Sequence, residues 1–194
     1  MGGTHVKRLN EEAKQIWKWC EERDLWVYAS YIASEENFRA DANSRILEPE
    51  TEYELSIGFF NRISNVFGSP AIDLFATRVN AKFERYVSWF VDPLAWEVDA
   101  FTLKWDQFYF YAFPPFSVIL RCLRKIKQEK AYGIMVVPLW QTQPWYPLFK
   151  QLLVGEPITL NPHKHMLLSS DRKPHPLWQH LTLVAGKLSG RHTK

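Results

Sequence analysis

Cysteines are rare in this sequence, and long apolar runs are missing. The 194 residues include only two cysteines, Cys20 and Cys122, which stand far apart and form no Cys-x-x-Cys pair. This argues against a disulfide framework or a cysteine-based metal site and predicts reduced thiols in an intracellular protein of the nucleus or cytoplasm. No apolar stretch approaches the roughly 18 residues of a membrane span, and no signal-peptide pattern is present. We therefore expect a soluble protein without a membrane partner.

Glycine-rich loops and catalytic clusters are also missing. No phosphate-binding glycine loop occurs, and no Ser/His/Asp or Cys/His arrangement stands out. His163 and His165 are separated by one residue, but no carboxylate or cysteine cluster completes a metal site, so no metal is predicted. The net charge of +3 is mild, and charge alone does not demand a nucleic-acid partner.

Nine tryptophans and a hydrophobic fraction of 46% indicate a folded protein. Ser56 and Ser117 are placed to cap helices, and Gly68 is placed to end one. Strands that alternate with helices predict an α/β fold with a mostly parallel, three-layer sheet. The expected strands are 71–76, 108–112, 134–139 and 157–160, with 85–89 as a further candidate, and the expected helices are 57–67, 117–130 and 144–153.

Composition divides the chain into four segments. Residues 1–47 hold a predicted amphipathic helix at 9–22 and a strand at 25–32. Residues 48–56 are polar and predict a linker. The main domain is expected at 57–160. Residues 161–194 are rich in His, Pro and Lys and predict a basic, loosely packed tail with one amphipathic segment near 177–188.

The segment 33–45, Ala-Ser-Glu-Glu-Asn-Phe-Arg-Ala-Asp-Ala-Asn-Ser-Arg, resembles the closing segment of retroelement ribonuclease H domains, which carries Ala-Asp-x-x-Ser-Arg. The resemblance implies that Asp41 matches the last of four acidic metal ligands, of which the other three are expected upstream of this chain. Two-metal hydrolysis needs several carboxylates, so we expect no ribonuclease activity from this chain alone. The sequence is equally compatible with Asp41 as an ordinary surface carboxylate.

A predicted strand, a Pro-Pro turn and a helix meet at residues 108–121, Phe-Tyr-Phe-Tyr-Ala-Phe-Pro-Pro-Phe-Ser-Val-Ile-Leu-Arg. Ligands usually bind where such strands end in an open α/β sheet. Phe113, Pro114, Pro115 and Phe116 resemble the Asp/Asn-Pro-Pro-Tyr/Phe motif of amino-group DNA methyltransferases, with the first, polar residue replaced. The resemblance implies that a flipped base stacks on Phe116 and that the Pro114 carbonyl accepts an amine proton. The second acceptor is lost at Phe113, which typically costs about 10² to 10³ in rate.

The stretch 73–77, Asp-Leu-Phe-Ala-Thr, together with Asn-Ala-Lys at 80–82, resembles the phage-type DNA adenine methyltransferases. That family implies a Rossmann-like methyltransferase sheet and S-adenosylmethionine as the cofactor. Asp73, Ala76 and Asp99 then match cofactor-binding positions. Asp73 is equally readable as a carboxylate that caps a turn, and the start of a loop is the favoured reading of Asp99.

These motifs occur together with Val-Pro-x-Trp-x-x-Gln-Pro-Trp at 137–145, and the combination resembles the polymerase polyprotein of DIRS-type tyrosine-recombinase retroelements. The resemblance implies a polyprotein fragment with a truncated ribonuclease H end and a degenerate methyltransferase-like domain. Such a fragment binds no cofactor and has the rest of the polyprotein as its partner. The alternative is an active, divergent DNA adenine methyltransferase that uses S-adenosylmethionine.

Nucleic acid is a further candidate partner. Arg121, Arg124 and Lys125 lie on one predicted helix and are candidates for phosphate contacts, although a solvated basic face is the commoner reading. Trp140 and Trp145 are candidates for stacking on bases, and burial against the sheet is the commoner explanation of such aromatics.

Overall fold

The computed structural model describes residues 11, 14–16, 18–20, 22 and 53–191, and the chain divides into two compact units, Met1–Ile46 and Leu47–Lys194. In the first unit, residues 14–16 and 18–20 are helical, in agreement with the helix predicted at 9–22. Cys20 is buried there, and Lys14 Nζ lies 3.0 Å from Glu11 Oε1. The predicted strand 25–32 and Asp41 lie outside the described residues.

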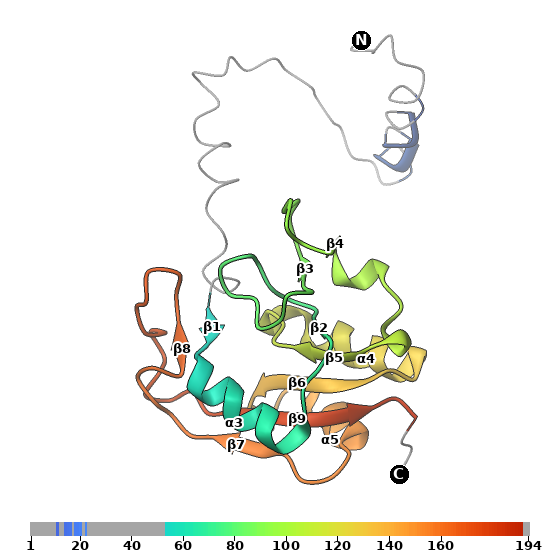
Figure 1. Cartoon of the computed structure of the whole chain (residues 1–194). Coiled ribbons are helices and arrows are strands. Elements are labelled where there is room, and N and C mark those ends of the chain that lie inside the picture. The colour runs from blue at the N-terminus through green and yellow to red at the C-terminus, as the bar shows by residue number, and fades with distance from the viewer. Residues whose placement is uncertain (1–10, 12–13, 17, 21, 23–52, 192–194) are drawn as a thin grey trace. The chain divides into compact units, whose positions relative to one another are not determined.

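The second unit is built on a five-stranded sheet (Figure 1). β2 (Ile72–Asp73), β5 (Tyr109–Ala112) and β6 (Tyr132–Pro138) are parallel. β9 (Leu183–Ser189) runs antiparallel to both of its neighbours, β6 and β7 (Ile158–Leu160). The sheet is therefore mixed and only partly parallel, which corrects the mostly parallel sheet expected from the sequence. In spatial order its strands are β2, β5, β6, β9 and β7.

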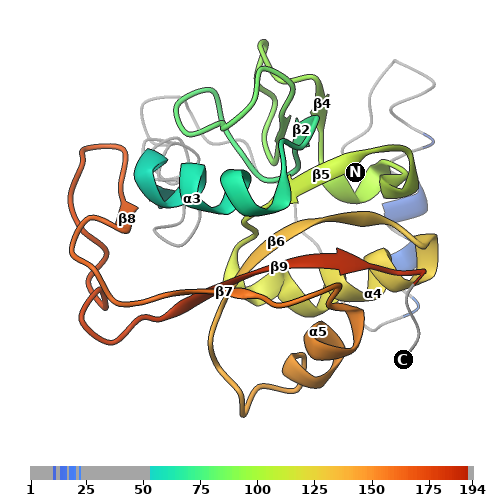
Figure 2. The same ribbon diagram turned by 60° about the horizontal axis from the view of Figure 1, so that its bottom comes forward.

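Helices cover both faces of this sheet (Figure 2). α3 (Ile57–Phe67) lies on one face, and α4 (Ile119–Glu129) and α5 (Tyr146–Leu152) lie on the other. Because strand side chains alternate between faces, Tyr111 packs in the cluster with α3 while Phe110 packs in the cluster with α4. The three predicted helices are confirmed. Among the described helices, none combines the length and the apolar character that crossing a bilayer requires.

The caps of these helices agree with the sequence only in part. Gly68 follows α3 with a φ of 88°, the left-handed region that favours glycine. Ser56 occupies the N-cap position of α3 but makes no side-chain capping bond. Ser117 does not cap α4, because a short 3₁₀ helix intervenes and Val118 becomes the N-cap residue.

Short elements surround the sheet. β1 (Glu54–Leu55) pairs antiparallel with β8 (Leu167–Leu168), and β3 (Val87–Ser88) pairs parallel with β4 (Glu97–Val98). β1 lies within the expected linker 48–56, and its Leu55 is fully buried. The remaining turns of helix are 3₁₀: η1 (Ala100–Thr102), η2 (Trp105–Gln107) and η3 (Phe116–Val118).

The prediction of a loosely packed tail at 161–194 is wrong at β9. This strand is buried along its length except at the partly exposed Lys187. Gly186 lies so close to α5 that a Cβ there would stand 2.4 Å from the Leu153 side chain. Residues with little or no side chain therefore let β9 pass beneath α5, and they also weaken the strand pattern in the sequence.

Candidate functional site

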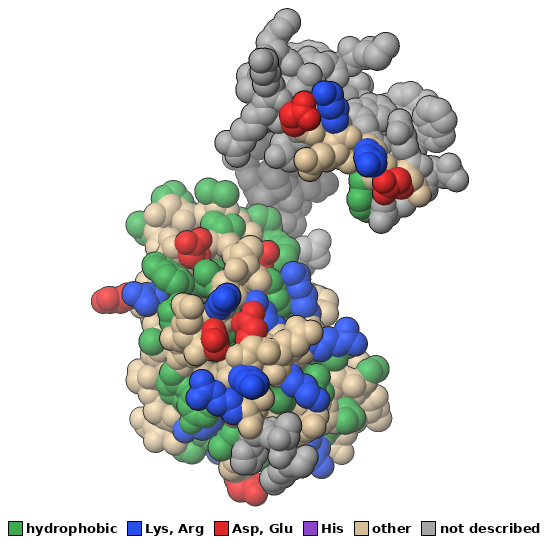
Figure 3. Space-filling view, turned by 90° about the vertical axis from the view of Figure 1, so that its right-hand side faces the viewer, with side chains coloured by type: hydrophobic (Ala, Val, Ile, Leu, Met, Phe, Trp, Pro, Cys, Tyr) green, Lys and Arg blue, Asp and Glu red, His purple; other side chains and the backbone are tan. Residues whose placement is uncertain are grey.

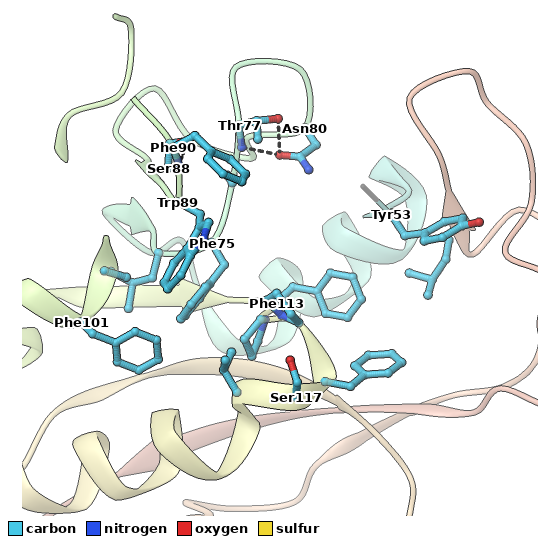
Figure 4. A pocket seen from close by; sticks show the side chains of 18 of the residues that line it. Tyr53, Phe75, Thr77, Asn80, Ser88, Trp89, Phe90, Phe101, Phe113 and Ser117 are labelled. Carbon is cyan, nitrogen blue, oxygen red and sulfur yellow. Dashed lines mark hydrogen bonds between the residues drawn. The ribbon is translucent and has the colours of Figure 1, made fainter. Parts of the chain in front are cut away.

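A cavity of about 360 Å³ opens where β2 and β5 end (Figure 4). Because these two strands are parallel neighbours, the segments that follow them, 74–77 and 113–118, reach the same edge of the sheet and line the cavity together. The sequence motifs that resemble a methyltransferase site thus lie around one hollow. The strands themselves hold the motifs in place, since Leu74 N–H donates to Tyr111 O at 2.9 Å.

The four residues of the degenerate motif line the cavity at the end of β5. Phe113 is half-buried, and its ring centroid lies 6.4 Å from that of Phe116. Pro114 is buried, and Pro115 is the N-cap residue of η3. Trp140 adds a partly exposed ring 5.2 Å from Phe116, in an edge-to-face arrangement. Phe113, Phe116 and Trp140 therefore form an aromatic wall at the end of β5.

Asp73 ends β2 but does not line the cavity. Its Oδ1 accepts the Phe75 N–H at 3.3 Å, and its Oδ2 accepts the Lys82 N–H at 3.1 Å. Burial raises the pKa of this carboxyl from its ordinary 3.8 to about 6, with the two hydrogen bonds acting in the opposite direction. Asp73 thus holds the loop that carries Ala76, whose buried side chain does line the cavity.

Asp99 also serves the backbone. It has a φ of 60° and caps η1, because its Oδ1 accepts the Phe101 N–H at 2.9 Å. Its own N–H donates to Ser88 O at 2.8 Å. Asp99 does not line the cavity, whereas its neighbours Ala100 and Phe101 do.

The polar side chains around the cavity are mainly hydroxyls and an amide, and His175 adds an imidazole. Asn80 Oδ1 accepts the Thr77 N–H at 2.7 Å and the Thr77 hydroxyl at 3.3 Å, as the dashed lines in Figure 4 mark. Ser88 and Ser117 supply further hydroxyls. Among the described residues that line the cavity, none is Asp, Glu, Lys or Arg. Such a lining suits a neutral, planar, apolar ligand better than a charged one.

The predicted nucleic-acid contacts differ in how accessible they are. Arg121 is exposed, and its guanidinium lies 3.7 Å from the centroid of the Phe101 ring, which lines the cavity. Arg124 is exposed as well. Lys125 is engaged inside the fold, because its Nζ lies 2.6 Å from Glu129 Oε1 and 3.2 Å from Phe101 O. Among the charged side chains on the face of the second unit shown in Figure 3, Lys and Arg are more prominent than Asp and Glu.

Trp145 is buried and packs against Tyr146 and Phe149. Its ring therefore belongs to the core rather than to a surface that stacks on bases. Trp140 remains partly exposed at the cavity rim. The two tryptophans of the 137–145 motif thus have different surroundings.

Sequence reasoning missed several residues that line the cavity. Trp89 and Phe90 lie at its mouth, and Tyr53 and His175 face one another across a centroid distance of 4.5 Å. The run of three apolar residues at 89–91 just before Asp-Pro was the available signal. Burial inside a strand is the usual fate of such a run, so exposure was not expected.

The chain matches no protein-family model, and it matches no curated protein sequence. Within the described residues, no group of three or more His, Cys, Asp or Glu side chains is arranged to hold a metal ion.

Proposed function

We propose that residues 53–191 form a degenerate DNA adenine methyltransferase-like domain from a DIRS-type retroelement polyprotein, and that this domain does not transfer methyl groups. The observation that carries the proposal is the cavity itself. Two segments that resemble the same enzyme family, 73–77 and 113–116, are far apart in sequence and border one hollow at the ends of neighbouring parallel strands. The remnant of ribonuclease H in residues 1–47 belongs to the same proposal through its sequence resemblance.

The donor set argues against S-adenosylmethionine as a cofactor. This molecule carries an ammonium, a carboxylate and a sulfonium, which need charged or polar partners when they leave water. Both oxygens of Asp73 accept loop N–H groups, and Asp99 Oδ1 is used to cap η1. Ala76 lines the cavity, but neither aspartate does, so the acidic residues at the matching positions do not fit the charged groups of the cofactor, and we assign it no role.

Phe113 argues against transfer chemistry. In the motif that it resembles, the residue at this position accepts a proton of the exocyclic amine and so directs the lone pair to the methyl donor. A phenyl ring accepts no such hydrogen bond. What remains is an aromatic cavity of about 360 Å³ without Asp, Glu, Lys or Arg among its described lining residues, near the lower end of the usual range for ligand pockets. Its chemistry supports the holding of a neutral ring such as a nucleobase.

Calorimetry with S-adenosylmethionine and a methyl-transfer assay on adenine-containing duplex DNA test this proposal. We expect no heat of binding at millimolar cofactor and no transfer by the 194-residue chain. The alternative, an active divergent methyltransferase, predicts tight cofactor binding and measurable turnover. Phe113→Asn would then increase turnover by restoring a hydrogen-bond acceptor. Phe113→Leu removes the ring without supplying an acceptor and would not increase turnover.

The retroelement origin has its own test in the genomic sequence upstream of the Met1 codon. A reading frame that encodes a reverse transcriptase and continues into this chain supports the proposal. An upstream region with no trace of a polymerase or of the three further ribonuclease H acids contradicts it.

A further inference from the structure

The loop between β3 and β4, residues 89–96, exposes large aromatic side chains beside the cavity. The exposed fractions of Trp89, Phe90 and Trp96 are 54%, 50% and 41%. Trp89 and Phe90 also line the cavity mouth (Figure 4), and the loop projects away from the sheet in Figure 1. These rings contribute little to the core, so their position calls for another explanation.

Hydrogen bonds fix the backbone beneath these rings. The Asp92 carboxylate accepts the Tyr86 hydroxyl at 3.0 Å, the Leu94 N–H at 3.0 Å and the Arg78 N–H at 3.2 Å. The Phe90 N–H donates to Ser88 Oγ at 3.3 Å. The aromatic rings are therefore presented on an ordered loop, and such preorganisation lowers the entropic cost of binding.

Two arginines lie over aromatic rings of this surface. The Arg85 guanidinium is 4.8 Å from the Trp96 centroid, and the Arg121 guanidinium is 3.7 Å from that of Phe101. Both arginines are exposed, and in the described part of the chain neither forms an ion pair with a carboxylate. Their N–H groups are free to bind an anion such as a phosphate.

We propose that this surface binds single-stranded nucleic acid. Unpaired bases stack on Trp89 and Phe90, the phosphates between them bind Arg85 and Arg121, and one base enters the cavity. Single strands fit better than duplexes because bases within a duplex cover one another's faces, whereas these rings need an open face to stack on. The entry of a base into the cavity rests on the proposed function. The new part of the inference is that the nucleic acid is single-stranded.

Fluorescence anisotropy with labelled strands of about 20 nucleotides tests the proposal on the full chain. We expect oligo-dT or oligo-U to bind more tightly than a duplex of equal length at the same salt concentration, and the two single strands separate DNA from RNA as the natural ligand. The double variant Trp89→Ala/Phe90→Ala should weaken binding about ten-fold or more. Arg121→Ala should lower the slope of log K against log salt by about 0.7.

Val91→Ala/Leu94→Ala is the matched control, because it removes two exposed apolar side chains from the same loop without removing a ring. Its affinity should equal that of the unchanged protein. Circular dichroism establishes that each variant is folded. Equal loss in both double variants, or a duplex that binds as tightly as a single strand, overturns the proposal.

A second copy of the chain is the competing occupant of this loop. Sedimentation that shows a dimer, abolished by both double variants, together with no binding of single strands, also overturns the proposal. Failure here is distinguishable from failure of the proposed function. The proposed function is tested by cofactor binding and methyl transfer, which the methyltransferase resemblance would assign to Asp73 and Phe113. The loop variants leave both residues unchanged, so each proposal stands or falls on its own measurement.

Discussion

Aromatic rings occupy two opposite environments in the second unit, the core behind the cavity and the 89–96 loop in front of it. Trp105 is fully buried, its Nε1–H donates to Ala100 O at 2.7 Å, and its ring lies 5.3 Å from that of Phe110. Trp89, in contrast, is more than half exposed. A buried tryptophan such as Trp105 stabilises the fold, whereas an exposed one such as Trp89 keeps its ring available for binding. The extent of burial therefore distinguishes the two roles of the same residue type.

The largest difference is expected in stability. Trp105→Ala removes a buried ring and the hydrogen bond to Ala100 O, and it should lower the free energy of unfolding by about 3–5 kcal/mol. Urea denaturation followed by circular dichroism measures this. Trp105→Phe keeps most of the packing and should cost clearly less. A loss below about 1 kcal/mol would show that the core around η2 relaxes to fill the space.

The stability of the fold should depend on pH through Asp73, the buried carboxylate at the end of β2. Its pKa of about 6 in the folded state exceeds the ordinary 3.8, so the folded state binds a proton more tightly between these values. The free energy of unfolding should therefore rise, by about 3 kcal/mol, as the pH falls through this window. Asp73→Asn should flatten that dependence in urea titrations, whereas Asp106→Asn, at an exposed site, should preserve it.

A smaller effect is expected at two tyrosines. Within the described part of the chain, the buried Tyr111 hydroxyl has no hydrogen-bond partner, so Tyr111→Phe should raise the free energy of unfolding by about 1 kcal/mol. Tyr86→Phe removes the hydrogen bond to Asp92 and should lower it by a similar amount. Opposite signs in the same denaturation experiment support the description of both sites. A loss of stability in Tyr111→Phe would contradict it.

The smallest effect on stability is expected at Trp89, in the exposed 89–96 loop. Trp89→Ala should change the free energy of unfolding by no more than about 0.5 kcal/mol, because its ring is largely in contact with water. Thermal melting and urea denaturation measure it. A loss comparable to that of Trp105→Ala would show that the loop is part of the core, and the binding role proposed for it would then lose its basis.

The main elements of the fold could be predicted where the apolar pattern is strong. α4 shows the helical spacing of Ile119, Leu123 and Ile126, and β5 and β6 are short, nearly continuous apolar runs. β9 was missed because Gly186 and Lys187 interrupt its apolar pattern. Only the approach of α5 explains why a glycine is needed there, and that approach is a long-range property of the fold.

The site was predictable at the strand ends and not beyond them. Ala76 and Phe113 line the cavity because parallel neighbouring strands end at one edge of a sheet, a general rule that needs only the positions of the two strands in the sequence. Trp89 and Tyr53 arrive from loops whose positions depend on tertiary packing. The ion pair between Lys125 and Glu129 follows from their spacing of four residues on a helix. The hydrogen bond from Lys125 to Phe101 O could not be predicted, because it depends on where η1 packs.

The placement of β9 has a consequence for how the chain acquires its structure. This strand is the latest in sequence among those described, yet it lies between β6 and β7 and pairs with β6 at seven positions. Until residues 183–189 emerge during synthesis, β6 presents an open edge that can pair with a neighbouring nascent chain. Premature termination ahead of this strand would therefore yield an aggregating product rather than a shortened working one.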